Sequence, residues 1–284
     1  MKHLIFIFVF LMPLCLTTAQ QISCSPENRT LVEAKIKEVN GLLQSDLGAT
    51  VAQVGKTFLS VPYVAKTLEI GETETLVVNL QGLDCTTFVE NAMAFGLMLH
   101  RGQTQFGDFT ETLEQLRYLD GKMDGYGSRL HYFTHWIRNN EKKGLLKDMT
   151  AALGGVGMEK DINFMGTHRE LYPFLKDDDN FEQILATEKG LAKEDFCYLP
   201  QDQIAANEHL IKTGDIIALA TSIKGLDVTH TGFAVREANG RIHLLHASTT
   251  SMEVEVTKEP LAEYLKGVSK NIGVLVARPM VPEK

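Results

Sequence analysis

The 284-residue sequence predicts an α+β fold in which N-terminal helices precede a mostly antiparallel C-terminal sheet. Through most of the first two thirds of the chain, apolar residues recur mainly at helical spacing. In the last third, short runs rich in apolar and β-branched residues are separated by turn signals. Helices first and strands later indicate antiparallel pairing, because parallel strands need crossover helices between them.

Five segments of the first half are expected to be helical: residues 27–47, 49–60, 85–100, 107–119 and 130–143. The 85–100 segment has a strongly apolar side that includes Phe88, Phe95 and Leu99. A change of pattern over 75–80 predicts a strand. The stretch 154–179 is mixed and polar, and its acidic run at 177–179 is read as a solvated loop. Residues 180–206 are expected to be helical with a loop.

Five strands are expected in the last third, at residues 216–220, 228–236, 241–247, 252–256 and 272–278. Turn signals separate them at 224–225, 238–240 and 266–267. The order of helices and strands therefore predicts that the 85–100 helix packs on a sheet built by the C-terminal third.

The N-terminus has the pattern of a signal peptide over residues 1–19. Lys2 precedes an apolar run over 4–16, and Ala19 suits the position before a cut. An uncleaved anchor and a lipoprotein modified at Cys24 are the alternatives. We expect export to the periplasm or cell envelope, with residues 20–284 forming a single domain that has helical insertions around 101–206.

The composition limits the partners. The formal net charge is -8 and no long basic run is present, so we expect no nucleic-acid partner and no attraction to anionic membranes. No other segment could cross a membrane. A monomer is favoured. After cleavage Cys24, Cys85 and Cys197 would remain; Cys24 and Cys197 could pair, which would leave Cys85 as a free thiol.

Cys85 stands where a loop meets the apolar helix. Asp84 is expected to cap that helix, which places Cys85 in its first turn. Unpaired backbone N–H groups and the helix dipole favour an anion there, so the thiol pKa should fall and the nucleophilic thiolate should form. The alternative is a buried and inert cysteine.

His230 and His246 lie on consecutive predicted strands. If 238–240 forms a three-residue hairpin loop with Gly240 in the left-handed conformation, Gly232 sits opposite His246. His230 then becomes a diagonal neighbour of His246 on the same face. A two-residue turn would shift the register by one and place the histidines on opposite faces.

Together these residues fit an activated nucleophile. Cys85 would attack a carbonyl, His230 would take its proton and return it to the leaving amine, and His246 would orient His230. Zinc is the competing use of cysteine and histidine. No Cys-x-x-Cys or His-Glu-x-x-His motif occurs, and His243 and His246 fall on opposite faces of a strand, so no metal and no cofactor are expected.

Five segments, in order, resemble the NlpC-type cell-wall cysteine peptidases, whose fold is papain-like. They are 61–63 (Val-Pro-Tyr), 84–89 (Asp-Cys-Thr-Thr-Phe-Val), 213–217 (Thr-Gly-Asp-Ile-Ile), 229–234 (Thr-His-Thr-Gly-Phe-Ala) and 245–248 (Leu-His-Ala-Ser). Thr86-Thr87 departs from the family's Ser-Gly. The resemblance implies that Tyr63 and the backbone N–H of Cys85 hold the oxyanion; core packing is the other role open to Tyr63.

Two further segments resemble the N-acetylmuramoyl-L-alanine amidase-like branch: 126–137 and 163–168, the second with Gly166 where the branch usually has serine. This resemblance spans most of residues 60–278. It implies a muropeptide or peptidoglycan fragment as partner, with or without anhydro-muramic acid, and cleavage of the amide between muramic acid and L-alanine. The substrate-binding candidates are Asp84, Arg129, His131, Tyr132, Trp136, Asn163, His168 and Thr229.

Within the 126–137 segment, Arg129 could clamp a carboxylate, and Tyr132 or Trp136 could lie against a sugar ring. The alternative is a helix that packs its aromatic side chains into the core. For function, a γ-D-glutamyl-diamino-acid endopeptidase, an inactive muropeptide-binding protein and an acyltransferase with the same nucleophile remain open.

Overall fold

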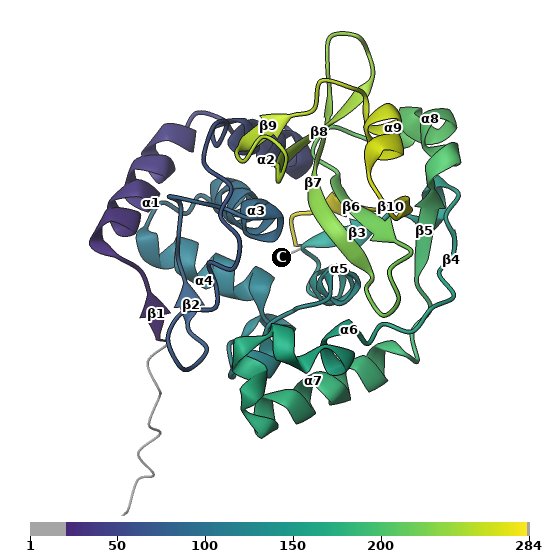
Figure 1. Cartoon of the computed structure of the whole chain (residues 1–284). Helices are drawn as coiled ribbons and strands as arrows, with labels where there is room; N and C mark the ends of the chain where they lie inside the picture. Colours follow the sequence, from purple (N-terminus) through teal and green to yellow (C-terminus); the bar gives the residue numbers. More distant parts are fainter. Residues whose placement is uncertain (1–20, 283–284) are drawn as a thin grey trace, which may run out of the picture.

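Helix α3 (Cys85–Arg101) is the centre of the N-terminal half. Every residue from Thr87 to Met98 is buried, because the helix is apolar on nearly all sides. Around it lie α1 (Pro26–Val39), α2 (Leu47–Lys56) and α4 (Phe106–Arg117). This computed structural model describes residues 21–282. Figure 1 shows α3 between α1 and α4 on one side and the sheet on the other, with α2 above it next to β8 and β9.

The C-terminal third builds most of an eight-stranded sheet whose strand pairs are all antiparallel. Its main path runs β4-β5-β10-β6-β7-β8-β9, with β3 paired to the end of β10. The strands are β3 (Leu146–Asp148), β4 (Val156–Gly157), β5 (Cys197–Pro200), β6 (Ile216–Thr221), β7 (Val228–Arg236), β8 (Ile242–Ala247), β9 (Val254–Val256) and β10 (Asn271–Pro279). The predicted α+β class with a mostly antiparallel sheet is confirmed. A separate parallel pair joins β1 (Ile22–Ser23) to β2 (Leu76–Val77).

The two faces of the sheet belong to different cores. Phe233 and Leu245 face α2 and α3 in the larger core. Ala234 and Leu244 turn to the other face and pack with Leu261, from the short helix α9 (Leu261–Tyr264). Successive side chains of β7 and β8 therefore point alternately into the cores on the two faces of the sheet.

A third core lies under the sheet and the central helix. It is formed by α6 (Phe164–Thr167), α7 (Asp178–Leu191) and neighbouring segments, with Tyr126, Tyr132, Met165 and Ile184 inside it. Helix α5 (Phe133–Lys142) instead buries its apolar residues in the larger core. Figure 1 shows α6 and α7 along the lower edge of the molecule. Another short helix, α8 (Ile204–Asn207), precedes β6.

Several expected boundaries are wrong. The first helix stops at Val39 instead of reaching 47, and residues 76–77 alone form the strand expected over 75–80. The acidic run is not a loop: Asp177 accepts a hydrogen bond from the backbone N–H of Asn180 and caps α7. Part of the segment expected to be helix and loop, at Cys197–Pro200, forms β5 instead.

The proposed signal peptide lies outside the described residues. Within residues 21–282, no helix is both long enough and apolar enough to span a bilayer. Cys24, Cys85 and Cys197 all carry free thiols, so the possible Cys24–Cys197 disulfide is not formed.

Candidate active site

Cys85 is the first residue of α3. Asp84 Oδ1 accepts the backbone N–H of Thr87 at 2.8 Å, and Thr87 Oγ1 in turn accepts the backbone N–H of Asp84 at 2.9 Å. This reciprocal capping box fixes where the helix begins. Thr87, one of the two departures from the Ser-Gly pattern, is thus the residue that completes the cap.

The Cys85 thiol is neutral in the resting site. Burial and the neighbouring Asp84 carboxylate raise its pKa to about 12. Hydrogen bonds from the Thr231 backbone and from Thr86 act in the opposite direction but are outweighed. The expected fall in the thiol pKa is therefore wrong, because desolvation disfavours the thiolate more than these donors favour it.

The β7–β8 hairpin has the three-residue loop that the sequence predicts. Glu237 N–H donates to Arg241 O at 3.0 Å, and Gly240 has φ +76°. Phe233 pairs with Leu245, so Gly232 is set beside His246. A Cβ at Gly232 would lie 2.9 Å from His246 Cβ, which explains the need for glycine there.

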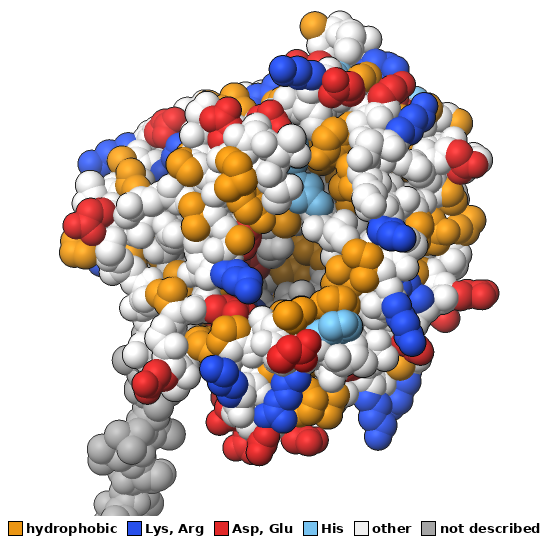
Figure 2. All heavy atoms as spheres, viewed as in Figure 1, with side chains coloured by type: hydrophobic (Ala, Val, Ile, Leu, Met, Phe, Trp, Pro, Cys, Tyr) orange, Lys and Arg blue, Asp and Glu red, His pale blue; other side chains and the backbone are white. Residues whose placement is uncertain are grey.

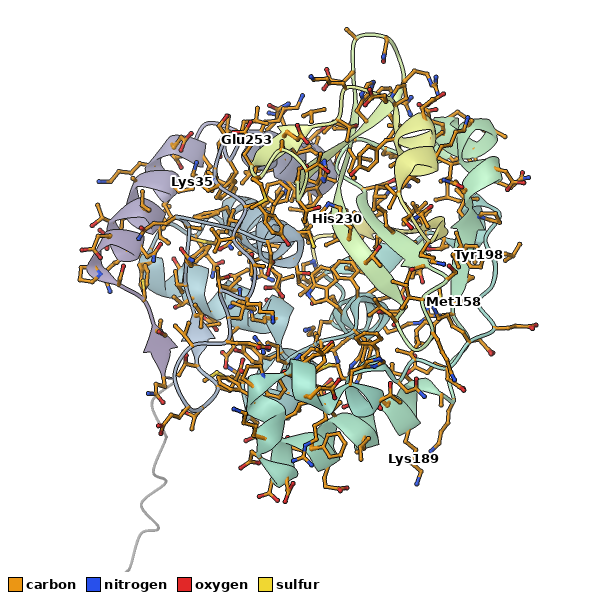
Figure 3. The ribbon with its side chains drawn as sticks, viewed as in Figure 1. Lys35, Met158, Lys189, Tyr198, His230 and Glu253 are labelled. Carbon is orange, nitrogen blue, oxygen red and sulfur yellow. The ribbon has the colours of Figure 1, made fainter. Side chains whose placement is uncertain are left out.

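This register brings the two predicted histidines into contact. His230 Nε2 lies 2.6 Å from His246 Nδ1, with the rings nearly perpendicular. Burial lowers the pKa of His230 to about 4 and that of His246 to about 3. Both imidazoles are therefore neutral at neutral pH. Figure 3 shows His230 on β7 where that strand passes α3.

Cys85 lies against the backbone of β7 next to the position of His230 in the sequence. The Thr231 N–H that hydrogen-bonds to the thiol belongs to the residue after His230. Because His230 Nε2 is occupied by His246, its Nδ1 is the nitrogen left to act as a base.

Tyr63 lies close to the same thiol. Its backbone bridges Leu83 and donates to Met252 O at 2.8 Å. Burial, followed by the charges of Cys85 and Asp84, raises the pKa of Tyr63 to about 12. Its hydroxyl thus stays protonated and can donate a hydrogen bond.

A cleft beside Asp84 is rich in charge. Its lining consists of Lys66, Leu68, Glu69, Asp84, Thr86, Glu90, Arg117, Arg129, Leu130 and His131. Figure 2 shows a hollow on this face of the molecule, with charged and histidine side chains around it. Three of the predicted binding residues, Asp84, Arg129 and His131, are thus brought together in a cleft next to Cys85.

Arg129 is held by buried partners. It lies 3.4 Å from Glu69 and 3.6 Å from Glu74, and its guanidinium covers the Tyr126 ring. His131 Nε2 contacts the Tyr126 carbonyl oxygen at 2.9 Å, and burial holds the His131 pKa well below its ordinary value. Both side chains are therefore fixed in place at the cleft.

Sequence reasoning missed the Glu90–Arg117 pair in this cleft. The two side chains are almost fully buried and 2.7 Å apart. Arg117 also donates to Val77 O at 2.8 Å. One signal was available: Glu90 is the single acidic residue in the otherwise apolar α3 segment, and a buried carboxylate needs a partner.

The roles suggested for Tyr132 and Trp136 are corrected by their burial. Tyr132 OH donates to Glu188 Oε1 at 2.7 Å and accepts the Met165 N–H at 2.8 Å. Trp136 is 0% exposed and stacks on Phe133. Neither ring offers a face to a sugar, so the alternative of aromatics packed inward holds.

Asn163 and His168 belong to α6 and its ends. The Asn163 backbone N–H donates to Gly225 O at 2.9 Å, and His168 stacks on Phe164 with Nδ1 2.9 Å from the Phe164 carbonyl oxygen. Gly166 is close to Glu188, whose carboxylate a Cβ would meet at 2.3 Å. Asn163 thus contacts the loop before β7 and His168 contacts its own helix, and neither contact involves Cys85. Thr229 is exposed on β7.

No cluster of three or more histidine, cysteine or acidic side chains suited to a metal occurs in the part of the chain that the structure describes. The chemistry available at this site is that of a thiol, two neutral imidazoles and a phenol hydroxyl. Such a set can perform nucleophilic attack with general base assistance.

Solved structures similar to this chain come from bacteria. An N-acetylmuramoyl-L-alanine amidase from Bacteroides uniformis is 39% identical, with a TM-score of 0.78, over 82% of this chain and 98% of that one. A Bacteroides fragilis protein provisionally described as a xylanase is 44% identical, with a TM-score of 0.74, over 79% and 98%. A Legionella pneumophila protein, 21% identical with a TM-score of 0.67 over 91% and 97%, shares the fold.

No curated protein matches the chain. The model of the N-acetylmuramoyl-L-alanine amidase-like family matches residues 53–273. That range contains the capped Cys85, the His230–His246 pair, Tyr63 and the charged cleft. The chain therefore belongs to the N-acetylmuramoyl-L-alanine amidase-like family.

Proposed function

We propose that this protein is a cysteine amidase that hydrolyses the bond between N-acetylmuramic acid and L-alanine in peptidoglycan fragments. The observation that carries the proposal is the contact between His230 and His246. His230 lies on β7, the strand whose backbone binds the Cys85 thiol. This arrangement supplies a nucleophile, a base and an orienting group in the family to which the chain belongs.

The proposed reaction starts from the neutral pair. As Cys85 Sγ attacks the lactyl carbonyl carbon, its proton passes to His230 Nδ1. The hydroxyl of Tyr63 and the backbone N–H of Cys85 stabilise the oxyanion. The C–N bond then breaks, and His230 returns the proton to the leaving L-alanine amine. A thioester remains on Cys85, and His230 deprotonates the water that hydrolyses it.

The cleft supports a charged peptide fragment as substrate. Lys66 at its rim offers positive charge, and Asp84 offers negative charge. A stem peptide carries both carboxylates and amines, so it complements such a lining. The family resemblance alone suggests that the sugar of the substrate is anhydro-muramic acid.

Cleavage of a sugar bond is the alternative that the name of the Bacteroides fragilis relative brings in. Glycosidases need two carboxyl groups with separate acid and base roles. Here Glu69 is ion-paired with Arg129 and Glu90 with Arg117. These partners favour structural roles for both carboxylates, and the thiol site remains the better supported reaction centre.

We would test the function by mass spectrometry of defined muropeptides, with and without anhydro-muramic acid, incubated with the protein and with Cys85→Ala. Release of an intact L-alanine-headed peptide by the wild type alone supports the amidase. Cleavage after D-glutamate would indicate the endopeptidase, and a cut between sugars would indicate a glycosidase. No cleavage by freshly reduced protein would indicate a binding protein.

The fold type, the export and the cellular location of the protein are part of the same proposal. We propose a papain-like NlpC-type fold, export directed by residues 1–19, and action in the periplasm or cell envelope as a monomer. Separate assays of periplasmic and cytoplasmic fractions, with mass determination of the mature N-terminus, test the export step. An intact residue 1 in the envelope fraction would contradict cleavage.

A further inference from the structure

One ring nitrogen of the histidine pair lacks a partner. His246 is 1% exposed, and its Nε2 has no hydrogen-bond partner, whereas its Nδ1 is taken by His230. Buried polar groups in folded proteins are nearly always hydrogen-bonded. The unpartnered nitrogen therefore points to an interaction that forms at a later stage than this resting structure.

The proton positions follow from the role of His230. If His230 Nδ1 is to accept the thiol proton, it must be unprotonated, so the proton of the neutral ring lies on Nε2. His230 Nε2 then donates to His246 Nδ1. A neutral His246 that accepts at Nδ1 must carry its own proton on Nε2, so the unpartnered nitrogen is an N–H donor.

Glu255 lies where its carboxylate can accept a hydrogen bond from His246 Nε2–H. In the β8–β9 pairing His246 stands directly opposite Glu255, and Glu255 Oε1 lies 3.9 Å from His246 Nε2. The distance exceeds a hydrogen bond, but the Glu255 side chain is 32% exposed and has room to turn. The other groups that face His246 are His230 from β7 and the Tyr264 ring from α9, edge-on at 5.6 Å.

We propose that Glu255 is a positioning residue of the amidase, resting on the function proposed above. When His230 takes the thiol proton, the imidazolium is stabilised through His246 by the Glu255 carboxylate. Glu255 itself is not protonated: it accepts a hydrogen bond from His246 Nε2–H and holds that ring in the tautomer that His230 requires. The site is then a chain of four side chains instead of three.

The kinetic test compares Glu255→Gln with the wild type. Gln keeps the shape and a carbonyl acceptor but removes the charge, so the imidazolium is less stable. We expect kcat to fall about tenfold with KM unchanged, and the acidic limb of kcat/KM to move to lower pH. Glu259→Gln, which removes an exposed carboxylate from the segment after β9, is the matched control and should behave as wild type.

A second readout does not depend on activity. In Cys85→Ala protein labelled with ¹⁵N-histidine, long-range ¹H–¹⁵N spectra report which nitrogen of His246 is protonated. We expect the Nε2–H tautomer. An Nδ1–H tautomer would overturn the proposal, as would a Glu255→Gln enzyme with wild-type kcat and pH profile. Failure of the wild type to cleave any muropeptide would instead refute the proposed function, and the spectra would still test the tautomer.

Discussion

At the scale of single residues, Cys85 and His230 are both uncharged at neutral pH. Burial raises the pKa of the thiol to about 12 and lowers that of His230 to about 4. At neutral pH the proton therefore stays on sulfur, and a thiolate–imidazolium pair is disfavoured. In the proposed reaction, proton transfer therefore accompanies the attack on the carbonyl, as it does when a base activates a hydroxyl nucleophile.

Asp84 has two roles that one substitution can separate. Asn caps helices as well as Asp does, so Asp84→Asn should keep the start of α3 but remove the charge that raises the Cys85 pKa. We expect iodoacetamide to alkylate Cys85 about three- to tenfold faster at pH 8 than in the wild type. Peptide mass spectrometry measures the rate, with Cys197 as internal reference. Equal rates would show that the charge has no influence on the thiol.

At the scale of elements, local patterns predict the sheet better than the cleft. The β7–β8 register follows from alternation and from Gly240, because both act within a few residues. The partners of buried charges, such as Arg117 on α4, come from distant segments and cannot be read from spacing. Tyr132 and Trp136 are also buried by distant segments, in two different cores, so spacing does not reveal their surroundings.

Gly232 is the place where the hairpin and the site depend on each other. In Gly232→Ala the new Cβ would lie 2.6 Å from Leu245 O, so β7 and β8 must separate near His246. We expect the free energy of unfolding to fall by about 1–3 kcal/mol, with loss of most amidase activity. Urea unfolding and kcat/KM measure the two effects. Gly267→Ala is the control, because nothing lies within 4 Å of that Cβ; wild-type activity in Gly232→Ala would contradict this role.

At the scale of the whole molecule, the site exists only where two parts of the chain meet. The N-terminal helical half supplies Cys85 at the start of α3, and the C-terminal sheet supplies His230 and His246. Phe88 on α3 packs edge-on against Phe233 on β7, which joins the two parts through their larger core. Packing of that core therefore sets how Cys85 lies relative to the two histidines.

The buried histidine pair also makes the stability of the whole molecule depend on pH. His230 and His246 have folded-state pKa values of about 4 and about 3, below the ordinary histidine value near 6.5. At a pH between the folded-state and the ordinary pKa values, the unfolded chain binds more protons than the folded protein. The stabilisation that the neutral pair contributes is therefore complete above about pH 6.5 and is lost as the pH falls. Between pH 7 and pH 5 we expect the free energy of unfolding to drop by about 2–3 kcal/mol, after allowance for the partial exposure of His230.

Urea unfolding at the two pH values measures that drop. In the double variant His230→Asn, His246→Asn, both titrating groups are absent, so the drop should shrink to what the remaining groups contribute. The comparison isolates the pair, because carboxylates that titrate in the same range are common to both proteins. An equal drop in the double variant would mean that other groups cause the pH dependence of stability. The two imidazoles would then have the same pKa values in the folded protein as in the unfolded chain.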